Sequence, residues 1–315
     1  MTHVGGIDLG GTKIEARLFD DRWAVLATRR LATPTDDYDD LVTALHEQIR
    51  WLQAEAGDPE LPVGVGAPGL INPATGIAFT ANLPATGRTL SADLSARSGK
   101  SVPFLNDCRA FALSEAALGA GRDHATVAGL VLGTGVAGGL VVNGALAPTQ
   151  NGQGGELGHC AISHQIVERL GLPIRGCGCG RIGCYETLLS GPGLQHLAQH
   201  VTGNEISPED LAARVLARDT DAELVYQHWL QLAAELVDLM MMTYDPNCIV
   251  LGGGLSHLPN LCARLVAQTA KIALPGTAVP QICLAEGGDS SGARGAALFA
   301  KRVAQSGQAT RSEVV

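Results

Sequence analysis

The sequence has few aromatic residues, little charge and no surplus of basic residues. Aromatic side chains make up 4% and charged side chains 17% of its 315 residues. Its hydrophobic fraction of 46% favours a folded protein with a core of Val, Leu, Ile and Ala, and the length suits two domains. The formal net charge of −9 argues against a nucleic-acid-binding surface, which needs a basic patch.

Two further absences concern location. No apolar run approaches the roughly 20 residues of a membrane-spanning helix, and residues 1–5 lack the basic and then apolar pattern of a signal peptide. The eight cysteines lack the dense spacing of a secreted disulfide scaffold. We therefore expect a cytoplasmic protein that binds neither a membrane nor a nucleic acid.

Strand and helix patterns alternate along the chain, which is typical of an α/β protein. Residues 4–9 and 14–19 resemble strands joined by a glycine turn, and residues 127–132 and 139–142 repeat this arrangement. The repeat predicts two related α/β domains around a cleft. The other predicted strands are 23–27, 63–65, 102–105 and 248–251. One predicted helix is capped by Thr35 and reaches residue 52. The other predicted helices are 109–118, 208–218, 222–242 and 291–303.

The first glycine turn has the residues of a phosphate-binding loop. Gly10 and Gly11 let backbone N–H groups point at phosphate oxygens, Thr12 adds a hydroxyl donor, and Lys13 follows. Asp8, at the end of the preceding strand, is placed to hold a hydrated Mg²⁺ ion. The glycine spacing differs from the Walker loop and from the dinucleotide fingerprint. A plain hairpin with a Gly-Gly turn explains the same residues equally well.

Two more glycine turns each follow an apolar strand. Gly133, Thr134 and Gly135 form one of them, and Gly253 and Gly254 belong to a run of three glycines in the other. Each turn taken alone also fits a hairpin or the start of a helix. Three such turns together predict a nucleotide held between two domains.

Asn106 and Asp107 stand where a predicted strand gives way to a helix. Asp107 can act as a general base toward a hydroxyl group, while the neighbouring amide of Asn106 fixes the substrate. Asp is also a preferred N-cap, and an N-cap needs no ligand. From the local sequence alone, the capping role is favoured.

Three cysteines lie within one glycine-rich loop. Cys177, Cys179 and Cys184 provide three thiolates, and His159 provides the fourth ligand of a tetrahedral Cys₃His site, with His164 as a nearby competitor. Three thiolates without an open position favour a structural zinc ion over a catalytic one. The alternatives are a disulfide or unrelated thiols, and a disulfide between Cys177 and Cys179 would be strained.

These features together resemble the ROK family of repressors, open reading frames and kinases. Residues 6–13, Gly-Ile-Asp-Leu-Gly-Gly-Thr-Lys, are similar to its first phosphate motif. Residues 155–159, Gly-Glu-Leu-Gly-His, and the pattern Cys-x-Cys-Gly-x-x-Gly-Cys-x-Glu at 177–186 are similar to its signature. The likeness covers nearly the whole chain. Within the family, bacterial N-acetylglucosamine kinases are most similar in residues 81–85, 90–97, 111–115 and 170–173, and related fructokinases share several of these.

The resemblance implies an α/β, two-domain actin-like (ribonuclease-H-like) fold with its active site in the interdomain cleft. One domain would contain residues 1–115 and the C-terminal helix at about 292–304. The other would contain residues 116–291 with the zinc loop, and the polar tail at 305–315 is expected to be disordered.

The family also implies transfer of phosphate from MgATP to the 6-hydroxyl of N-acetylglucosamine, with Asp107 as the base, in a homodimer. The residues that would hold the sugar are Gly69, Asn82, Asn106, Asp107, Glu156, His159 and Glu186. The family often has Asn-Asp-Ala-Asn at the base, whereas Cys108 and Arg109 occupy the last two positions here. Arg109 is expected to alter packing or substrate preference and not to abolish activity.

Rival functions follow from the same family. Within the kinases, the rivals use glucose, fructose, mannose or N-acetylmannosamine. Family repressors carry an N-terminal helix-turn-helix domain, and the phosphate loop that begins at Gly6 leaves no room for one. An inactive sugar-sensing regulator is a third reading, and the presence of Asp107 and the glycine turns argues against it.

Overall fold

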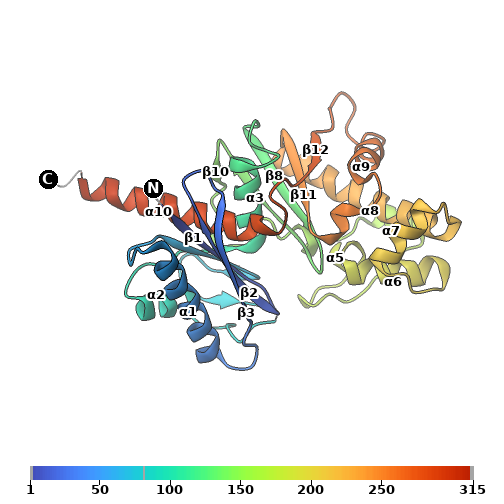
Figure 1. The fold of residues 1–315 in the computed structure, drawn as a ribbon. Coiled ribbons are helices and arrows are strands. Elements are labelled where there is room, and N and C mark those ends of the chain that lie inside the picture. The colour runs from blue at the N-terminus through green and yellow to red at the C-terminus, as the bar shows by residue number, and fades with distance from the viewer. Residues whose placement is uncertain (1–2, 81, 313–315) are drawn as a thin grey trace. The chain divides into compact units, whose positions relative to one another are not determined.

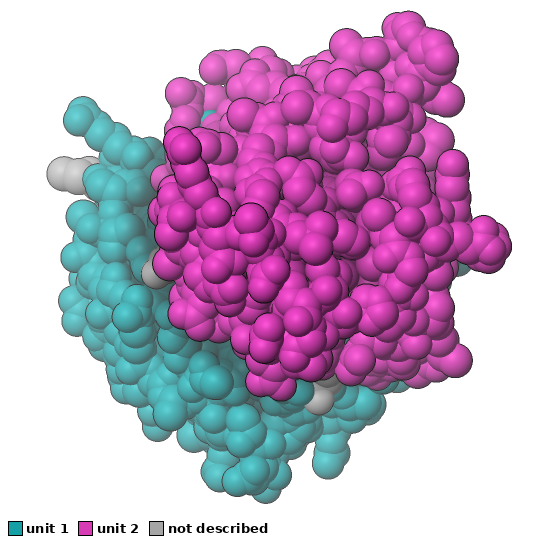
Figure 2. Space-filling view, turned by 90° about the vertical axis from the view of Figure 1, so that its right-hand side faces the viewer, with its two compact units in different colours: residues 1–119, 145–154, 287–315 teal, residues 120–144, 155–286 magenta. Residues whose placement is uncertain are grey.

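The computed structural model describes residues 3–80 and 82–312, and the chain divides into two compact units (Figures 1 and 2). Unit 1 consists of Met1–Gly119, Ala145–Gly154 and Gly287–Val315, and unit 2 of Ala120–Gly144 and Gly155–Glu286. The boundaries expected from the sequence put residues 145–154 in the second domain. The structure groups them with unit 1, where Arg109 donates a hydrogen bond to the carbonyl oxygen of Ala147 at 2.8 Å.

Unit 1 is built on a mixed sheet with the strand order β3-β2-β1-β4-β7. β1 pairs antiparallel with β2 and parallel with β4, which pairs parallel with β7, so three strands end at the same edge. The elements of unit 1 are β1 (Val4–Leu9), β2 (Lys13–Phe19), β3 (Val25–Ala32), α1 (Tyr38–Ala56), β4 (Val63–Ala67), β5 (Leu70–Ile71), β6 (Ala78–Phe79), α2 (Leu90–Ser98), β7 (Phe104–Asn106), α3 (Asp107–Leu118), β10 (Ala145–Leu146), the 3₁₀ helix η3 (Gly288–Ser290) and α10 (Ser291–Ser312).

Unit 2 repeats the arrangement of its central strands. β9 pairs antiparallel with β8, β8 is parallel to β11, and β11 is parallel to β12. The elements of unit 2 are β8 (Thr126–Leu132), β9 (Val136–Val142), η1 (Leu157–His159), α4 (His164–Leu170), α5 (Glu186–Leu189), α6 (Gly191–Thr202), α7 (Pro208–Leu216), α8 (Thr220–Tyr244), β11 (Cys248–Gly252), η2 (Gly254–His257), α9 (Leu261–Thr269) and β12 (Gln281–Leu284). The strand, glycine turn and strand expected twice from the sequence are therefore both present.

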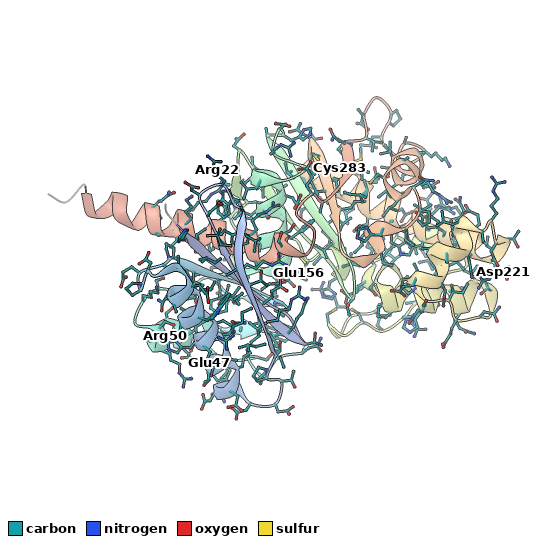
Figure 3. The ribbon with its side chains drawn as sticks, viewed as in Figure 1. Arg22, Glu47, Arg50, Glu156, Asp221 and Cys283 are labelled. Atoms are coloured by element: carbon teal, nitrogen blue, oxygen red, sulfur yellow. The ribbon has the colours of Figure 1, made fainter. Side chains whose placement is uncertain are left out.

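Each unit has its own hydrophobic core. In unit 1, Leu41, Leu45 and Ile49 of α1 are fully buried against the sheet, while Glu47 and Arg50 lie on the exposed face of the helix (Figure 3). In unit 2, the long helix α8 supplies much of the core. A one-sided apolar pattern thus places α1 on its sheet, as amphipathic periodicity predicts. No helix in the described ranges is long and apolar enough to cross a membrane.

Helix α10 packs unusually close to the sheet of unit 1. A Cβ atom added to Gly6 would lie 1.9 Å from the carbonyl oxygen of Ala293, and one added to Gly64 would lie 2.1 Å from that of Ala296. One added to Gly295 would lie 1.8 Å from the carbonyl oxygen of Ala110 on α3. Real Cβ atoms do not approach backbone this closely, so only glycine fits at these three positions.

Some predicted boundaries are wrong for local reasons. Thr35 is not the N-cap of α1. That role belongs to Asp37, whose carboxylate accepts hydrogen bonds from the N–H groups of Asp39 and Asp40 at 2.7 and 3.0 Å. Trp23 has a positive φ of 66°, and the third strand covers Val25–Ala32 instead of 23–27.

The C-terminal segment also differs from its prediction. Helix α10 continues to Ser312 and does not end near residue 303. Residues 304–312 contain no proline and only one glycine, so nothing in them stops a helix. The expectation of a disordered tail from residue 305 is therefore wrong up to Ser312, and residues 313–315 lie outside the described residues.

The close approach of α10 can be tested on strand β4. Gly64→Ala is expected to lower the free energy of unfolding by about 1–3 kcal/mol or more, because its methyl group would meet backbone. Gly66→Ala on the same strand is the matched control, since its Cβ would have its nearest neighbour at 3.6 Å, an ordinary contact. Urea unfolding of the two variants measures the difference. Equal losses in both would contradict the packing described here.

Candidate active site and metal group

Two carboxylates occupy the edge where the parallel strands of unit 1 end. Asp8 lies near the end of β1, and Asp107 directly follows β7. Burial raises the pKa of Asp8 to about 6, and the negative charge of Asp107 adds to the increase. Burial likewise raises the pKa of Asp107, against the opposing effect of the Cys108 N–H group. The charge of Asp107 therefore acts on Asp8, and the elevated pKa values of the two carboxylates favour proton acceptance.

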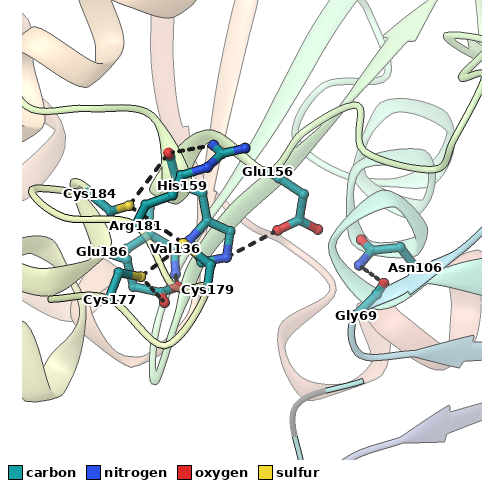
Figure 4. Close-up of polar contacts among 10 residues, drawn as sticks. All are labelled: Gly69, Asn106, Val136, Glu156, His159, Cys177, Cys179, Arg181, Cys184 and Glu186. Carbon is teal, nitrogen blue, oxygen red and sulfur yellow. Dashed lines mark hydrogen bonds and ion pairs between the residues drawn. The ribbon is translucent and has the colours of Figure 1, made fainter. Parts of the chain in front are cut away.

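Asn106 performs the capping role that the sequence offered to Asp107. Its Oδ1 atom accepts a hydrogen bond from the N–H group of Arg109 at 3.1 Å, which makes Asn106 the N-cap of α3. Its Nδ2 atom donates to the carbonyl oxygen of Gly69 at 2.9 Å (Figure 4). Asp107 is instead the first residue of the helix, and its Oδ1 atom accepts from the N–H group of Cys108 at 2.8 Å. The capping interpretation of Asp107 is thus wrong.

Only glycine fits at position 69. Its φ angle is 83°, and an added Cβ would lie 2.3 Å from the carbonyl oxygen of Phe79. The turn after β4 is therefore held against β6 on one side and bound to Asn106 on the other. Both contacts place this turn beside the start of α3.

The first glycine turn joins β1 to β2 within the same unit. The N–H group of Gly10 donates to the carbonyl oxygen of Lys13 at 2.9 Å, and Thr33 donates through its hydroxyl to the carbonyl oxygen of Gly10 at 2.7 Å. A Cβ on Gly11 would lie 3.8 Å from that of Asn82, so this exposed amide stands beside the turn. Thr12 and Lys13 follow in exposed positions at the start of β2.

Gly292, at the start of α10, was not singled out from the sequence. A Cβ at this position would lie 3.2 Å from the Asp8 carboxylate, so its absence makes room for that group. A small residue in the first turn of a helix is a weak signal by itself. Only the tertiary structure brings it beside Asp8.

The two glycine turns of unit 2 lie against each other. Gly253 has a φ of 80°, and its Cβ would lie 2.4 Å from the carbonyl oxygen of Leu132 and 3.0 Å from the nitrogen of Gly133. This contact arises because β8 and β11 are parallel neighbours and their turns leave at the same edge. Thr134 and Gly254 are exposed beside this contact. The sequence predicts the two turns separately, and the structure shows that they lie in contact with each other.

The cysteine loop and His159 form a compact group that could hold a metal ion. The ligand atoms of His159, Cys177, Cys179 and Cys184 all lie within 4.8 Å of one another (Figure 4). Cys177 Sγ lies 3.6 Å from His159 Nδ1, and Cys179 Sγ lies 3.7 Å from Cys184 Sγ. Tetrahedral zinc, with bonds of about 2.3 Å to sulfur and 2.0–2.1 Å to nitrogen, needs separations of about 3.6–3.8 Å. The four residues therefore fit zinc.

His164, the alternative ligand, does not belong to this group. Its side chain is exposed on α4, where Nε2 lies 3.1 Å from a carboxylate oxygen of Glu168. The structure therefore selects His159 between the two histidines.

Two of the three candidate sugar contacts of unit 2, Glu156 and Glu186, lie beside the four candidate metal ligands. The third, His159, is one of those ligands. His159 turns Nδ1 toward Cys177 and Nε2 toward Glu156, whose carboxylate lies 3.9 Å away (Figure 4). Glu186 has one carboxylate oxygen 4.0 Å from Cys177 Sγ, and its other oxygen accepts a hydrogen bond from the N–H group of Val136 at 2.9 Å. One imidazole nitrogen thus faces the thiolates while the other stays free of them.

Comparison with known proteins identifies the family of this chain. The ROK family model matches residues 4–303. This chain belongs to the ROK family. An N-acetylgalactosamine kinase of Shewanella sp. strain ANA-3 is 38% identical over 295 residues, 93% of this chain and 95% of the relative. An N-acetyl-D-glucosamine kinase of Pectobacterium atrosepticum is 37% identical over 297 residues, 93% of this chain and 97% of the relative.

Comparison with solved structures leads to the same family. The crystal structure of a ROK family glucokinase from Streptomyces griseus, in complex with glucose and AMPPNP, superimposes with a TM-score of 0.78 at 25% identity. It covers 95% of this chain and 99% of that one. The two-domain, actin-like α/β fold expected from the sequence is confirmed.

The elevated pKa of Asp8 makes a prediction about stability. The pKa is 3.8 for an unperturbed group and about 6 in the folded protein, so the folded state binds more protons between these values and loses stability as the pH rises through them. Asp8→Asn removes the buried charge. We expect it to raise the free energy of unfolding by about 1–3 kcal/mol at pH 8, and to have no such effect below about pH 4.

Glu15→Gln is the matched control on β2. Burial raises the pKa of Glu15, but hydrogen bonds from Arg30 and Arg17 lower it, and the pKa lies below its usual value overall. This carboxylate therefore stabilises the folded state at pH values above its unfolded pKa. The control should therefore lower stability at pH 8. Urea unfolding at pH 4 and pH 8 measures both variants, and a loss of stability in Asp8→Asn at pH 8 would contradict the interpretation.

Proposed function

We propose that this chain phosphorylates the 6-hydroxyl of N-acetyl-D-glucosamine with ATP, using Asp107 as the general base. The chain is an ATP-dependent hexose or hexosamine kinase of the ROK family. The choice of sugar rests on relatives named N-acetylhexosamine kinases that are 37–38% identical over 93% of the chain. The choice of base rests on the buried carboxylate of Asp107, which stands at the carboxyl ends of the parallel strands.

In this proposal, the sugar hydroxyl gives its proton to Asp107 as its oxygen forms a bond to the γ-phosphorus. The bond from the γ-phosphorus to its bridging oxygen breaks, and ADP leaves. Such a transfer depends mainly on positioning and on charge stabilisation, so an oriented carboxylate and backbone donors suffice. Asn106 supports the orientation, because it caps α3 and binds the Gly69 carbonyl.

The nucleotide is assigned to the three glycine turns. Gly10, Gly11, Thr12 and Lys13 would bind phosphate from unit 1, and the turns at residues 133–135 and 253–254 would bind the nucleotide from unit 2. Asp8 would hold the hydrated Mg²⁺ ion that accompanies ATP, an ion that neutralises developing phosphate charge. Support comes from the exposed positions of Thr12 and Lys13 in the first turn, of Thr134 in the second and of Gly253 and Gly254 in the third. It also comes from the Asp8 carboxylate, whose negative charge is disfavoured by burial and by Asp107, so a cation would neutralise it.

The sugar is assigned to the residues that match the family's sugar-binding positions. The proposed contacts are Gly69, Asn82, Asn106, Asp107, Glu156, His159 and Glu186. Zinc bound by His159, Cys177, Cys179 and Cys184 would be structural, since four protein ligands complete its coordination. It would fix the ring of His159 through Nδ1 and leave Nε2 to a sugar hydroxyl. The separations of the four ligand atoms support this assignment.

A second sugar has specific support. The relative that is 38% identical is named an N-acetylgalactosamine kinase, so the epimer at the 4-hydroxyl is the main alternative substrate. Glucose, fructose, mannose and N-acetylmannosamine are weaker alternatives, and a sugar-sensing regulator is weaker still. A cytoplasmic location, a homodimer and the absence of nucleic-acid and membrane partners remain predictions.

ADP release from MgATP with a panel of these sugars tests the proposal. N-acetylglucosamine is expected to give the highest kcat/KM and to yield the 6-phosphate. Asp107→Asn is the control, because it keeps the size of the side chain and removes the base. It should lower kcat by about 10²–10⁴-fold while sugar binding is largely retained. Another preferred sugar would overturn the choice of substrate, and near-normal turnover in the variant would overturn the choice of base.

Metal analysis tests the zinc assignment separately. Wild-type protein should carry zinc by elemental mass spectrometry, and Cys179→Ser should lose it, because a hydroxyl is a much poorer zinc ligand than a thiolate. Cys262→Ser is the matched control, since Cys262 is half-buried on α9 and outside the group. Full zinc content in Cys179→Ser would contradict the site as drawn.

A further inference from the structure

The turn at residues 133–136 is held at both ends by one segment of unit 2. Glu186 accepts a hydrogen bond from the N–H group of Val136 at 2.9 Å, and Gly191 donates one to the carbonyl oxygen of Gly133 at 2.8 Å. A Cβ on Gly135 would lie 2.9 Å from the same carboxylate oxygen of Glu186. The segment from Glu186 to Gly191, which contains α5, therefore fixes where the turn begins and where it ends.

A second segment packs on the strand that leaves this turn. The N–H group of Gly138 donates to the carbonyl oxygen of Gly155 at 2.7 Å. A Cβ on Gly155 would lie 2.1 Å from the carbonyl oxygen of Gly138, and a Cβ on Gly158 would lie 2.1 Å from that of Val136. The backbone of residues 155–158 thus lies directly against the first residues of β9.

The metal group connects these two segments. His159 follows directly after Gly158, and Cys184 stands two residues before Glu186. Their backbones are also joined, because the N–H group of Tyr185 donates to the carbonyl oxygen of Cys160 at 3.0 Å. A metal ion bound by the four ligand residues would thus link both supports of the turn at 133–136.

We propose that Glu186 is a positioning residue for the nucleotide, and that metal binding sets the shape of the glycine turn at residues 133–136. The inference rests on the proposed function, which assigns this turn to ATP. A charged carboxylate accepting a backbone N–H is among the stronger hydrogen bonds in proteins. It holds the Val136 amide in place, and the Gly133 N–H group donates to the carbonyl oxygen of Gly135 at 3.0 Å. The N–H groups of Thr134 and Gly135 are therefore held in position for phosphate without being ordered at the moment of binding.

The role proposed above for Glu186, direct contact with the sugar, predicts something different. A pure sugar contact would affect sugar binding alone and leave nucleotide binding unchanged. A positioning residue changes nucleotide affinity even when no sugar is present. The two roles can also coexist, because Glu186 has a second carboxylate oxygen, 4.0 Å from Cys177 Sγ.

Two substitutions separate these roles. Glu186→Gln keeps a side-chain carbonyl that can accept the Val136 N–H, whereas Glu186→Ala removes the acceptor. Calorimetric titration with MgAMPPNP in the absence of sugar should show about tenfold weaker binding for Glu186→Ala, and binding within about threefold of wild type for Glu186→Gln. Hydrogen exchange in a peptide covering residues 133–138 should accelerate in Glu186→Ala only.

Removal of the metal from wild-type protein gives an independent measurement. A chelator should accelerate exchange in the same peptide and weaken MgAMPPNP binding, and added zinc should restore both. This arm does not depend on the folding of Glu186→Ala. Unchanged exchange and affinity in both Glu186→Ala and the chelated protein would overturn the inference while leaving the proposed function intact. Failure of wild-type protein to bind MgAMPPNP would instead refute the proposed nucleotide site, and this inference with it.

Discussion

The backbone contact between α10 and the sheet of unit 1 is the constraint on which that unit depends. Gly6, Gly64 and Gly295 let carbonyl oxygens and Cα atoms meet without side chains between them. Such an approach brings the first turn of α10 beside Asp8, because Gly292 lies next to the carboxylate. Burial in this packing raises the pKa of Asp8. One packing arrangement thus sets both the position and the chemistry of an acid in the proposed active site.

A buried carboxylate, that of Glu115, binds the first turn of α10 and the segment before it. Glu115 of α3 has no exposed surface, and it accepts hydrogen bonds from the N–H group of Gly287 at 3.0 Å, the hydroxyl of Ser291 at 2.7 Å and the guanidinium of Arg294 at 3.0 Å. Buried carboxylates are costly unless such donors surround them. Asp107 begins the same helix that carries Glu115, so α3 joins the proposed base to the support of α10. The local sequence predicted a helix here but gave no sign of this network.

Unit 2 also positions its proposed nucleotide-binding turns by close backbone packing, but it uses different elements. Its glycine turns meet because two parallel strands end side by side, and the segments that carry the four candidate metal ligands pack against one of these turns. Glycine serves the same purpose in both units, since it allows one backbone to lie against another where a functional group must be placed. The strand, glycine turn and strand repeated along the chain therefore mark two similar scaffolds, each with its own method of fixing a turn.

The sequence by itself determined the alternation of strands and helices, the three glycine turns and the cysteine loop, because these depend on short-range patterns and on residue chemistry. It could not choose between His159 and His164, or decide whether Asp107 or Asn106 caps α3, since both members of each pair suit the local pattern. The tertiary structure decided these points by bringing Nδ1 of His159 to Cys177 and Oδ1 of Asn106 to the first turn of the helix. It also placed Gly292 beside Asp8 and Glu186 beside Val136. Contacts between residues 50 to more than 280 positions apart in the chain leave no periodic trace in sequence, so only folding reveals them.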